Sequence, residues 1–152
     1  MNDEQRAAVV TEAKTWLGTP YQDRQAVKGC GADCAMFPLA VYQACNMLDS
    51  AAAPQYAAQW HLHHTRELYL EFVLQYAEEI QDVPLPADFM MFRTAPAFKS
   101  GGNVIEHPYS HGAIVVEYPM VIHATKGRGV VYCDLSRELR WLERKLFKLK
   151  EQ

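Results

Sequence analysis

The sequence has no apolar run that could span a membrane, no surplus of basic residues and no closely paired cysteine motif. A membrane-spanning helix needs about 20 consecutive apolar residues, and none of the apolar runs here approaches that length. The formal net charge is −3, whereas nucleic-acid-binding domains usually have a basic surface. Basic residues gather only between positions 137 and 150, a feature interpreted as a solvated face rather than a site for an anionic polymer. We therefore expect neither a membrane span nor a nucleic-acid partner.

The cysteines lack the C-x-x-C spacing that is typical of redox pairs and zinc sites. Cys30 precedes Cys34 by four positions and could resolve an oxidised thiol, but an incidental loop cysteine is the preferred interpretation. The first residues, 1–6, are polar and acidic, unlike a secretory signal. We therefore expect reduced thiols. Any action outside the cytoplasm would then depend on another route of delivery, such as a phage tail, an injection device or lysis.

Length and periodicity predict one α+β domain that covers residues 1–152. A chain of 152 residues can bury about 68–70% of its unfolded surface without disulfides or a structural metal. Apolar residues recur at helical spacing in the first half of the chain, whereas the second half has short strand-like runs. Helices followed by strands favour an antiparallel sheet. The predicted helices cover 7–17, 33–47 and 65–80, and the predicted strands cover 88–92, 112–117, 120–124, 129–133 and 145–149.

Cys34 is the first candidate for chemistry, because it follows a glycine-containing loop at the expected start of the second helix. A free thiol has a pKa near 8.5. A helix N-terminus contributes roughly 0.3–1 kcal/mol, less than the ~1.36 kcal/mol that lowers a pKa by one unit. An imidazole from elsewhere in the chain must therefore supply most of the activation. The alternative is that Cys34 is a small buried core residue.

His111 and His123 are the candidates for that imidazole. Each lies in or beside a predicted strand, and they are separated by twelve positions with a turn at Tyr118-Pro119. Both side chains share a sheet face if the hairpin loop has an odd number of residues or if a bulge intervenes. One imidazole would then face the thiol, and the other would orient it. Taken singly, each histidine is better interpreted as a core or edge residue with satisfied hydrogen bonds, and only the combination with Cys34 favours chemistry.

Four short motifs occur in a fixed order along most of the chain: Trp16-Leu17-Gly18-Thr19-Pro20-Tyr21, Gly31-Ala32-Asp33-Cys34, Ser110-His111-Gly112-Ala113-Ile114-Val115 and Val121-Ile122-His123-Ala124. Together they resemble the NlpC-type cysteine peptidases, papain-like enzymes that cut the peptide bridges of bacterial cell walls. The spacing, with Trp141 and Arg144 before the last strand, also resembles the short phage-tail branch of that family. The resemblance extends from about residue 8 to residue 149. Each motif is weak alone, and the set is fairly specific.

The resemblance implies a papain-like fold in which N-terminal helices pack on a C-terminal antiparallel sheet. It also implies hydrolysis of an amide bond in a peptidoglycan stem peptide, typically between D-γ-glutamate and a diamino acid. Cys34 would be the nucleophile, His111 the general base and acid, and His123 the orienting residue, with no cofactor and no metal. The Cys34 amide would help bind the oxyanion, and Tyr21 and Asp33 would belong to the oxyanion and substrate-binding region.

The chain departs from the family pattern just after the cysteine. Family members commonly have Ser-Gly or Ile-Gly where this chain has Ala35-Met36. Ala35 cannot supply a hydroxyl to hold the amino end of a peptide. Pro38 is also unusual so close to the nucleophile, because it removes a backbone donor from the first turns of the helix. The helix is therefore expected to be kinked there or to start slightly later.

Two further classes of function fit the same residues. One is a thiol-dependent amidase or acyltransferase that acts on another substrate. The other is a catalytically silent binding module of a phage tail or other delivery assembly, because a fold does not fix an activity. A metal site built on His61, His63 and His64 is not expected, since no cysteine or carboxylate cluster completes it nearby.

Overall fold

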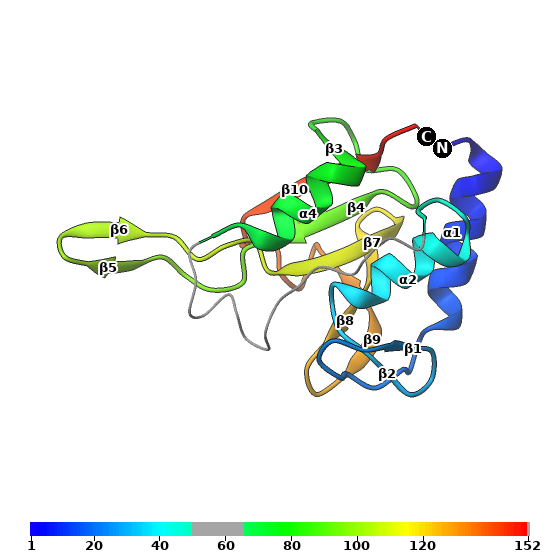
Figure 1. Cartoon of the computed structure of the whole chain (residues 1–152), viewed down its shortest axis with the longest axis horizontal. Coiled ribbons are helices and arrows are strands. Elements are labelled where there is room, and N and C mark those ends of the chain that lie inside the picture. The colour runs from blue at the N-terminus through cyan, green and yellow to red at the C-terminus, as the bar shows by residue number, and fades with distance from the viewer. Residues whose placement is uncertain (50–65, 152) are drawn as a thin grey trace.

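The computed structural model describes residues 1–49 and 66–151. Helices α1 (Asp3–Thr15), α2 (Met36–Ala44) and α4 (Leu68–Tyr76) precede most of the strands, as the sequence predicts (Figure 1). The main sheet of the described residues has six antiparallel strands in the order β3-β10-β4-β7-β8-β9. These strands are β3 (Ala77–Ile80), β4 (Phe89–Phe92), β7 (His111–Glu117), β8 (Met120–Thr125), β9 (Gly129–Asp134) and β10 (Arg144–Leu149).

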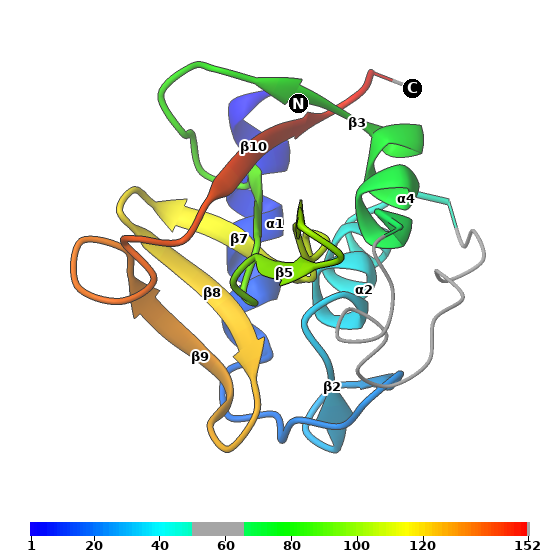
Figure 2. The same cartoon turned by 90° about the vertical axis from the view of Figure 1, so that its left-hand side faces the viewer.

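The helices cover one face of the sheet, and a loop covers the other. The first core joins Val9 of α1, Phe37 of α2 and Tyr69 of α4 to sheet residues such as Ile114. The second core lies on the opposite face, where the segment after β9 packs Leu135 and its neighbours against the strands. Figure 2 shows α1 behind the sheet with α2 and α4 beside each other. Because β7 and β8 have buried residues on both faces, they are central to the fold.

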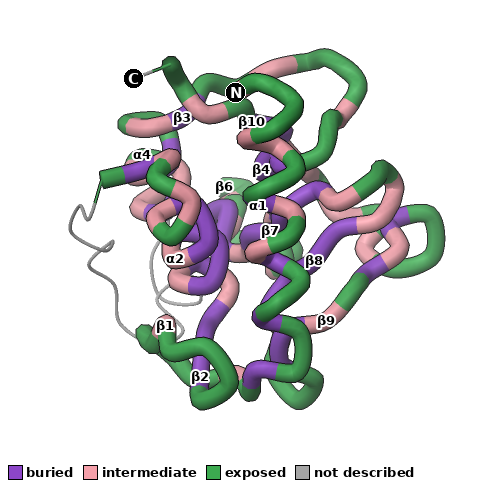
Figure 3. Tube along the Cα trace, turned by 90° about the vertical axis from the view of Figure 1, so that its right-hand side faces the viewer, coloured by how far each residue is buried: buried purple, intermediate pink, exposed green. Residues whose placement is uncertain are grey.

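Helix α1 is fixed at its start and along its length. The Asn2 side chain accepts from Gln5 N at 2.8 Å, and the Gln5 side chain accepts from Asn2 N at 2.9 Å, which is a reciprocal capping box. Further along, Arg6 forms a 2.8 Å ion pair with the buried carboxylate of Asp88, at the start of β4. Along α1, buried positions alternate with exposed ones (Figure 3). Helix α1 therefore packs against one face of the sheet.

The predicted third helix is too long at its C-terminal end. Helix α4 ends at Tyr76, and residues 77–80 form β3, which pairs with β10. Ion pairs connect the two strands, from Lys145 to Glu79 at 2.8 Å and from Lys148 to Glu78 at 3.0 Å. Such pairing with a remote strand overrides the local helix propensity of these residues. The start of this predicted helix at residue 65 lies outside the described residues.

A second hairpin was not predicted. Strands β5 (Phe98–Ser100) and β6 (Asn103–Ile105) pair across Gly101 and Gly102, which both have positive φ. A Gly-Gly pair suits a two-residue hairpin turn, so the signal is present in the sequence. The hairpin projects from the body of the molecule (Figure 1). A short two-stranded sheet, β1 (Ala26–Val27) with β2 (Gly31–Ala32), lies in the loop before α2. No helix among the described residues has the length and apolar character needed to cross a bilayer.

Candidate active site

Asp33 fixes the backbone around Cys34. Its Oδ1 accepts hydrogen bonds from Ala35 N at 3.0 Å and Met36 N at 2.7 Å, and its Oδ2 accepts from Arg24 N at 2.7 Å. The side chain is buried. Two of these donors are free amides at the start of α2, so Asp33 caps the helix. Because both carboxylate oxygens have backbone partners, the contacts assign Asp33 to capping, and its expected contact with substrate stays a prediction.

The thiol of Cys34 lies against the start of β7. Its Sγ donates to the carbonyl oxygen of Ser110 at 3.4 Å. Burial, with a smaller contribution from the negative charge of Asp33, raises the pKa of the thiol to about 12, although the N–H groups of Gly112 and Cys34 act in the opposite direction. The sulfur therefore contacts backbone groups of the residues on both sides of His111. Pairing of β7 with β8 starts only at Ala113, so this edge of β7 is available to the thiol.

The rings of His111 and His123 are in direct contact. His111 Nε2 and His123 Nδ1 share a 2.7 Å hydrogen bond, with the rings nearly perpendicular at a centroid distance of 4.9 Å. A register shift between Val115 and Glu117 allows this contact, because it places Ala113, two residues after His111, directly opposite His123. Residues two apart on a strand share a face. Of the two conditions that the sequence left open, an odd-numbered hairpin loop or a bulge, the structure has the bulge, and both imidazoles lie on one face.

His123 is a buried, neutral imidazole. Its side chain is 3% exposed. Burial lowers its pKa to about 4, and the positive charge of Arg128 contributes in the same direction. Among the described residues, none forms a hydrogen bond with its Nε2. When His111 Nε2 donates, His123 Nδ1 must accept, and the proton of the neutral ring then lies on this buried Nε2. An unsatisfied buried donor of this kind costs roughly 1–3 kcal/mol.

Tyr21 lies on the same side of the molecule as the thiol. It forms a parallel bridge with Ala32, next to Asp33. Burial raises the pKa of its hydroxyl, and the negative charges of Cys34, Asp33 and Asp23 raise it further. The ammonium group of Lys126, in the turn between β8 and β9, lies 5.8 Å from the centre of the Tyr21 ring. The phenol is therefore close enough to Cys34 for their charges to interact, and its contact with substrate stays a prediction.

A network of charged groups, not recognised in the sequence, holds the segment before His111. Tyr109 N donates to Glu67 at 2.8 Å, and the Tyr109 hydroxyl donates to Glu143 at 2.6 Å. Arg93 donates to Glu143 at 2.9 Å and to the carbonyl of His107, and it stacks over the Tyr109 ring at 4.5 Å. These residues are far apart in sequence and belong to no local motif. Only their approach in the fold reveals that they position the start of β7.

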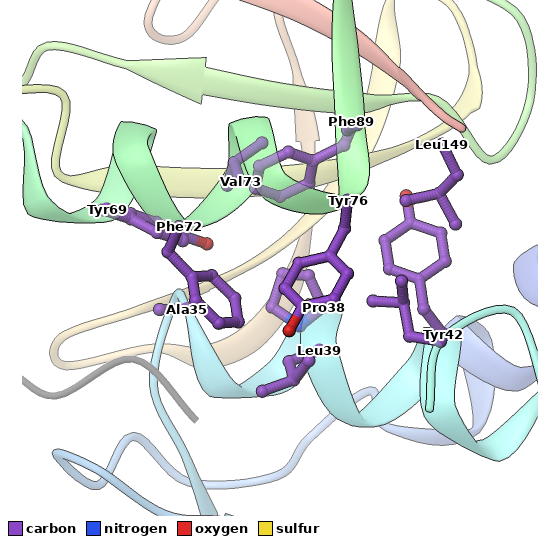
Figure 4. A pocket seen from close by; sticks show the side chains of 12 residues that line it. Ala35, Pro38, Leu39, Tyr42, Tyr69, Phe72, Val73, Tyr76, Phe89 and Leu149 are labelled. Carbon is purple, nitrogen blue, oxygen red and sulfur yellow. The ribbon is translucent and has the colours of Figure 1, made fainter. Parts of the chain in front are cut away.

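Tyr69 was also missed, although it touches the backbone of Cys34. Its hydroxyl donates to the Cys34 carbonyl oxygen at 3.3 Å. An apolar pocket of about 40 Å³ lies beside this contact, between α2 and α4 (Figure 4). It is lined by Tyr69, Pro38 and other side chains of these helices, and it does not include Cys34 or either histidine. The pocket is a packing gap between helices rather than the site of the candidate chemistry.

The remaining cysteines and histidines lie elsewhere. All four cysteines are free thiols; Cys30 is exposed, and Cys133 is buried in the second core. Cys45 packs against the first core. The histidines at positions 61, 63 and 64 lie outside the described residues. Within residues 1–49 and 66–151, no three side chains of the metal-ligating types gather into a candidate metal site.

Comparison with known proteins identifies the fold. No protein-family model and no curated protein sequence matches the chain. Among solved structures, NlpC2 from Trichomonas vaginalis superposes with a TM-score of 0.61 at 18% identity, covering 97% of this chain and 48% of that one. A Staphylococcus aureus protein similar to a lipoprotein of the NLP/P60 family gives 0.62 at 20% identity, covering 100% and 43%.

A third structure matches over nearly its whole length. The NlpC/p60 domain of the peptidoglycan hydrolase SagA has a TM-score of 0.56 at 18% identity, covering 93% of this chain and 97% of that domain. The chain therefore spans less than half of the Trichomonas and Staphylococcus proteins but almost all of this isolated domain. These likenesses establish an α+β fold of the NlpC/p60 type, with N-terminal helices on an antiparallel sheet, as expected.

Proposed function

We propose that this protein is a cysteine hydrolase that cleaves amide bonds in the stem peptides of peptidoglycan. The observation that carries the proposal is the juxtaposition of Cys34 with an imidazole pair. The thiol contacts the backbone on both sides of His111, and His111 is itself hydrogen-bonded to His123. A nucleophile, a base and a residue that orients the base are the parts that acyl transfer by a thiol needs.

In the proposed reaction the Cys34 sulfur attacks the carbonyl carbon of the scissile amide while His111 takes the thiol proton. The C–S bond forms, and the carbonyl oxygen becomes an oxyanion facing the Cys34 N–H. The C–N bond then breaks, and the amine leaves with the proton from His111. Water, deprotonated by His111, hydrolyses the thioester and regenerates the thiol. Throughout, His123 Nδ1 accepts the hydrogen bond from His111 Nε2 and fixes the ring.

The raised pKa of Cys34 specifies how the proton moves. With a pKa of about 12, the thiol is protonated in the free protein at neutral pH. The sulfur therefore does not rest as a thiolate, and its proton is transferred to His111 as the C–S bond forms. The low pKa of His123 keeps that ring uncharged at neutral pH, so it can accept from a protonated His111 without repelling it.

The substrate class rests on the likeness in fold. One of the similar structures is the NlpC/p60 domain of a peptidoglycan hydrolase, and this chain covers nearly all of that domain. Within this class we propose the bond between D-γ-glutamate and a diamino acid, with Tyr21 beside the substrate. We also propose that the protein reaches the wall by delivery with a phage tail or another injection device, or by release on lysis.

Digestion of purified peptidoglycan tests the proposal. Mass spectrometry of the soluble fragments should show new peptides with free amino termini at the diamino acid after incubation with the wild-type protein. Cys34→Ala should release none, whereas Cys30→Ala, which removes an exposed thiol, should behave as wild type. Fragment release by Cys34→Ala at the wild-type rate would end the proposal.

The neutral thiol also favours one alternative, a catalytically silent binding module. A thiol with a pKa of about 12 that no base can deprotonate would be inert. The same incubation separates the two functions. A silent module would co-sediment with peptidoglycan without releasing peptides, and a Cys34 thioester that accumulates without hydrolysis would instead identify an acyltransferase.

A further inference from the structure

The first turn of α2 lacks one hydrogen bond of its ladder. Phe37 N donates to Asp33 O at 3.0 Å, and Leu39 N donates to Ala35 O at 3.4 Å. The bond between these two would run from residue 38 to the carbonyl of Cys34, because helical amides bond four residues back. Residue 38 is proline, which has no N–H. The carbonyl of Cys34 therefore has no donor within its own helix.

Tyr69 supplies the missing donor from another helix. Its hydroxyl bonds to Cys34 O at 3.3 Å, and its side chain is 4% exposed. The ring packs edge-on against Phe89, with centroids 6.2 Å apart. Tyr69 of α4 and Ala35, the residue that follows Cys34, both line the gap between the two helices (Figure 4). The hydroxyl thus replaces the bond that Pro38 removes.

Gly112 leaves the space that this arrangement needs. A Cβ atom at position 112 would lie 2.5 Å from the Tyr69 hydroxyl and 2.6 Å from the Phe89 ring. Gly112 is also the residue whose backbone N–H lowers the pKa of Cys34. The Tyr69 hydroxyl therefore lies close both to the Cys34 backbone and to the strand that carries His111.

We propose that Tyr69 is a positioning residue for the Cys34 nucleophile and that Pro38 makes the Cys34 carbonyl available to it. The hydroxyl fixes the peptide between Cys34 and Ala35, and thereby the direction of the sulfur and of the Cys34 N–H. Tyr69 touches the backbone rather than the sulfur, so it acts through Cys34. The catalytic consequence rests on the proposed function, whereas the effect on thiol reactivity does not.

A purely structural role makes a different prediction. If Tyr69 only fills the core, removing its hydroxyl leaves Cys34 unchanged, and a donor at position 38 has no influence. If Tyr69 positions the thiol, Pro38→Ala can compensate for the lost hydroxyl, because this substitution restores a backbone N–H that can donate to Cys34 O in the ordinary helical way. Rescue by a residue on the other helix is therefore the deciding observation.

The test compares Tyr69→Phe, Pro38→Ala, the double variant and Tyr76→Phe, a control tyrosine on α4. Alkylation by iodoacetamide is followed at each cysteine by mass spectrometry, with exposed Cys30 as the internal reference. We expect Tyr69→Phe to slow Cys34 alkylation about tenfold, the effect of one lost hydrogen bond. We expect Tyr76→Phe to leave it unchanged and the double variant to recover to within about twofold of Pro38→Ala.

The outcomes separate this inference from the proposed function. An unchanged rate in Tyr69→Phe, or a double variant as slow as Tyr69→Phe, overturns it. If Tyr69→Phe fails to fold, the double variant decides the outcome. A double variant that folds and whose Cys34 is alkylated as fast as in Pro38→Ala supports the positioning role of Tyr69. A double variant that also fails to fold overturns that role. Wild-type protein that releases no wall peptide but shows the expected alkylation pattern would end the proposed function alone. Where wall peptides are released, kcat should follow the alkylation rates with KM unchanged.

Discussion

Cys34 and the two histidines are held in place by two different kinds of structure. Cys34 lies between a loop and a helix, where single side chains, Asp33 and Tyr69, bond to the surrounding backbone. The histidines lie on paired strands at the centre of the sheet, where backbone pairing and burial fix their positions. The thiol side thus depends on a few separate polar contacts, whereas the imidazole side depends on the register of the whole sheet.

This difference predicts how the two regions respond to substitution. Individual hydrogen bonds contribute about 0.5–1.5 kcal/mol each, so changes on the thiol side should be graded and separable. The register of β7 and β8 is cooperative, because a shift of one residue moves every side chain to the opposite face. Changes on the imidazole side should therefore affect the chemistry or the stability of the whole domain.

The largest effect is expected for the base. His111→Ala removes the group that accepts the thiol proton, and kcat for release of wall peptides should fall about 10²–10⁴-fold. Because His111 is only half-buried at the start of its strand, the variant should remain folded by circular dichroism. His107→Ala, a nearby histidine outside the ring pair, serves as the control. Equal rates for His111→Ala and wild type would remove His111 from the mechanism.

The next effect concerns stability at acidic pH. The folded-state pKa of His123 is lowered to about 4 from 6.5 by burial, so the unfolded chain binds this proton more tightly than the folded one. The contribution of His123 to the free energy of unfolding is therefore fully present above pH 6.5. As the pH falls toward 4, this contribution is lost, and the free energy of unfolding drops by about 3 kcal/mol. His123→Gln cannot titrate, so its free energy of unfolding should fall less than that of wild type across this range.

Urea unfolding at pH 7.0, 5.5 and 4.5 measures the free energy of unfolding of wild type and of His123→Gln. The difference between wild type and His123→Gln isolates the histidine from the carboxylates, which titrate in both proteins. The glutamine carbonyl can also accept from His111, so the variant should retain part of the activity. Parallel stability curves for the two proteins would contradict the buried, neutral state of His123.

A smaller effect is expected for the cap of α2. Asp33→Ala removes the acceptor of two amides at the helix start and of Arg24 N, and should lower the free energy of unfolding by about 1–2 kcal/mol. Asp23→Ala, in the same loop, is the control. Chemical denaturation at pH 7 provides the measurement. A loss confined to Asp23→Ala would show that Asp33 does not fix the helix start.

The sequence was sufficient to predict elements that depend on local signals. It was insufficient for elements whose structure depends on pairing with a remote segment. The five predicted strands occur within one or two residues of their expected bounds, because alternating apolar runs and turns are local signals. Helix α2 starts at Met36, later than the expected Asp33. Pro38 predicted this late start, because proline is also a local signal. Residues 77–80 were assigned to a helix, because their pairing with β10 depends on a strand more than sixty positions away.

The candidate site shows the same division. Cys34, His111 and His123 could be singled out because thiols and imidazoles in short motifs are visible in the sequence. Tyr69 could not, because nothing in its neighbourhood distinguishes it from another apolar position of α4. Pro38 marked an irregularity beside the cysteine, but only the fold reveals which side chain replaces its missing N–H. Residues that act through the backbone of others have no sequence motif.

The most direct test of the central claim is the reactivity of Cys34 with and without its base. Site-resolved alkylation at pH 7, with Cys30 as the internal reference, should show that His111→Gln slows Cys34 by at least about tenfold. Such dependence would demonstrate that a thiol with a raised pKa is activated by the imidazole beside it. An equal Cys34 rate in wild type and His111→Gln would contradict the assignment of these residues to one catalytic unit.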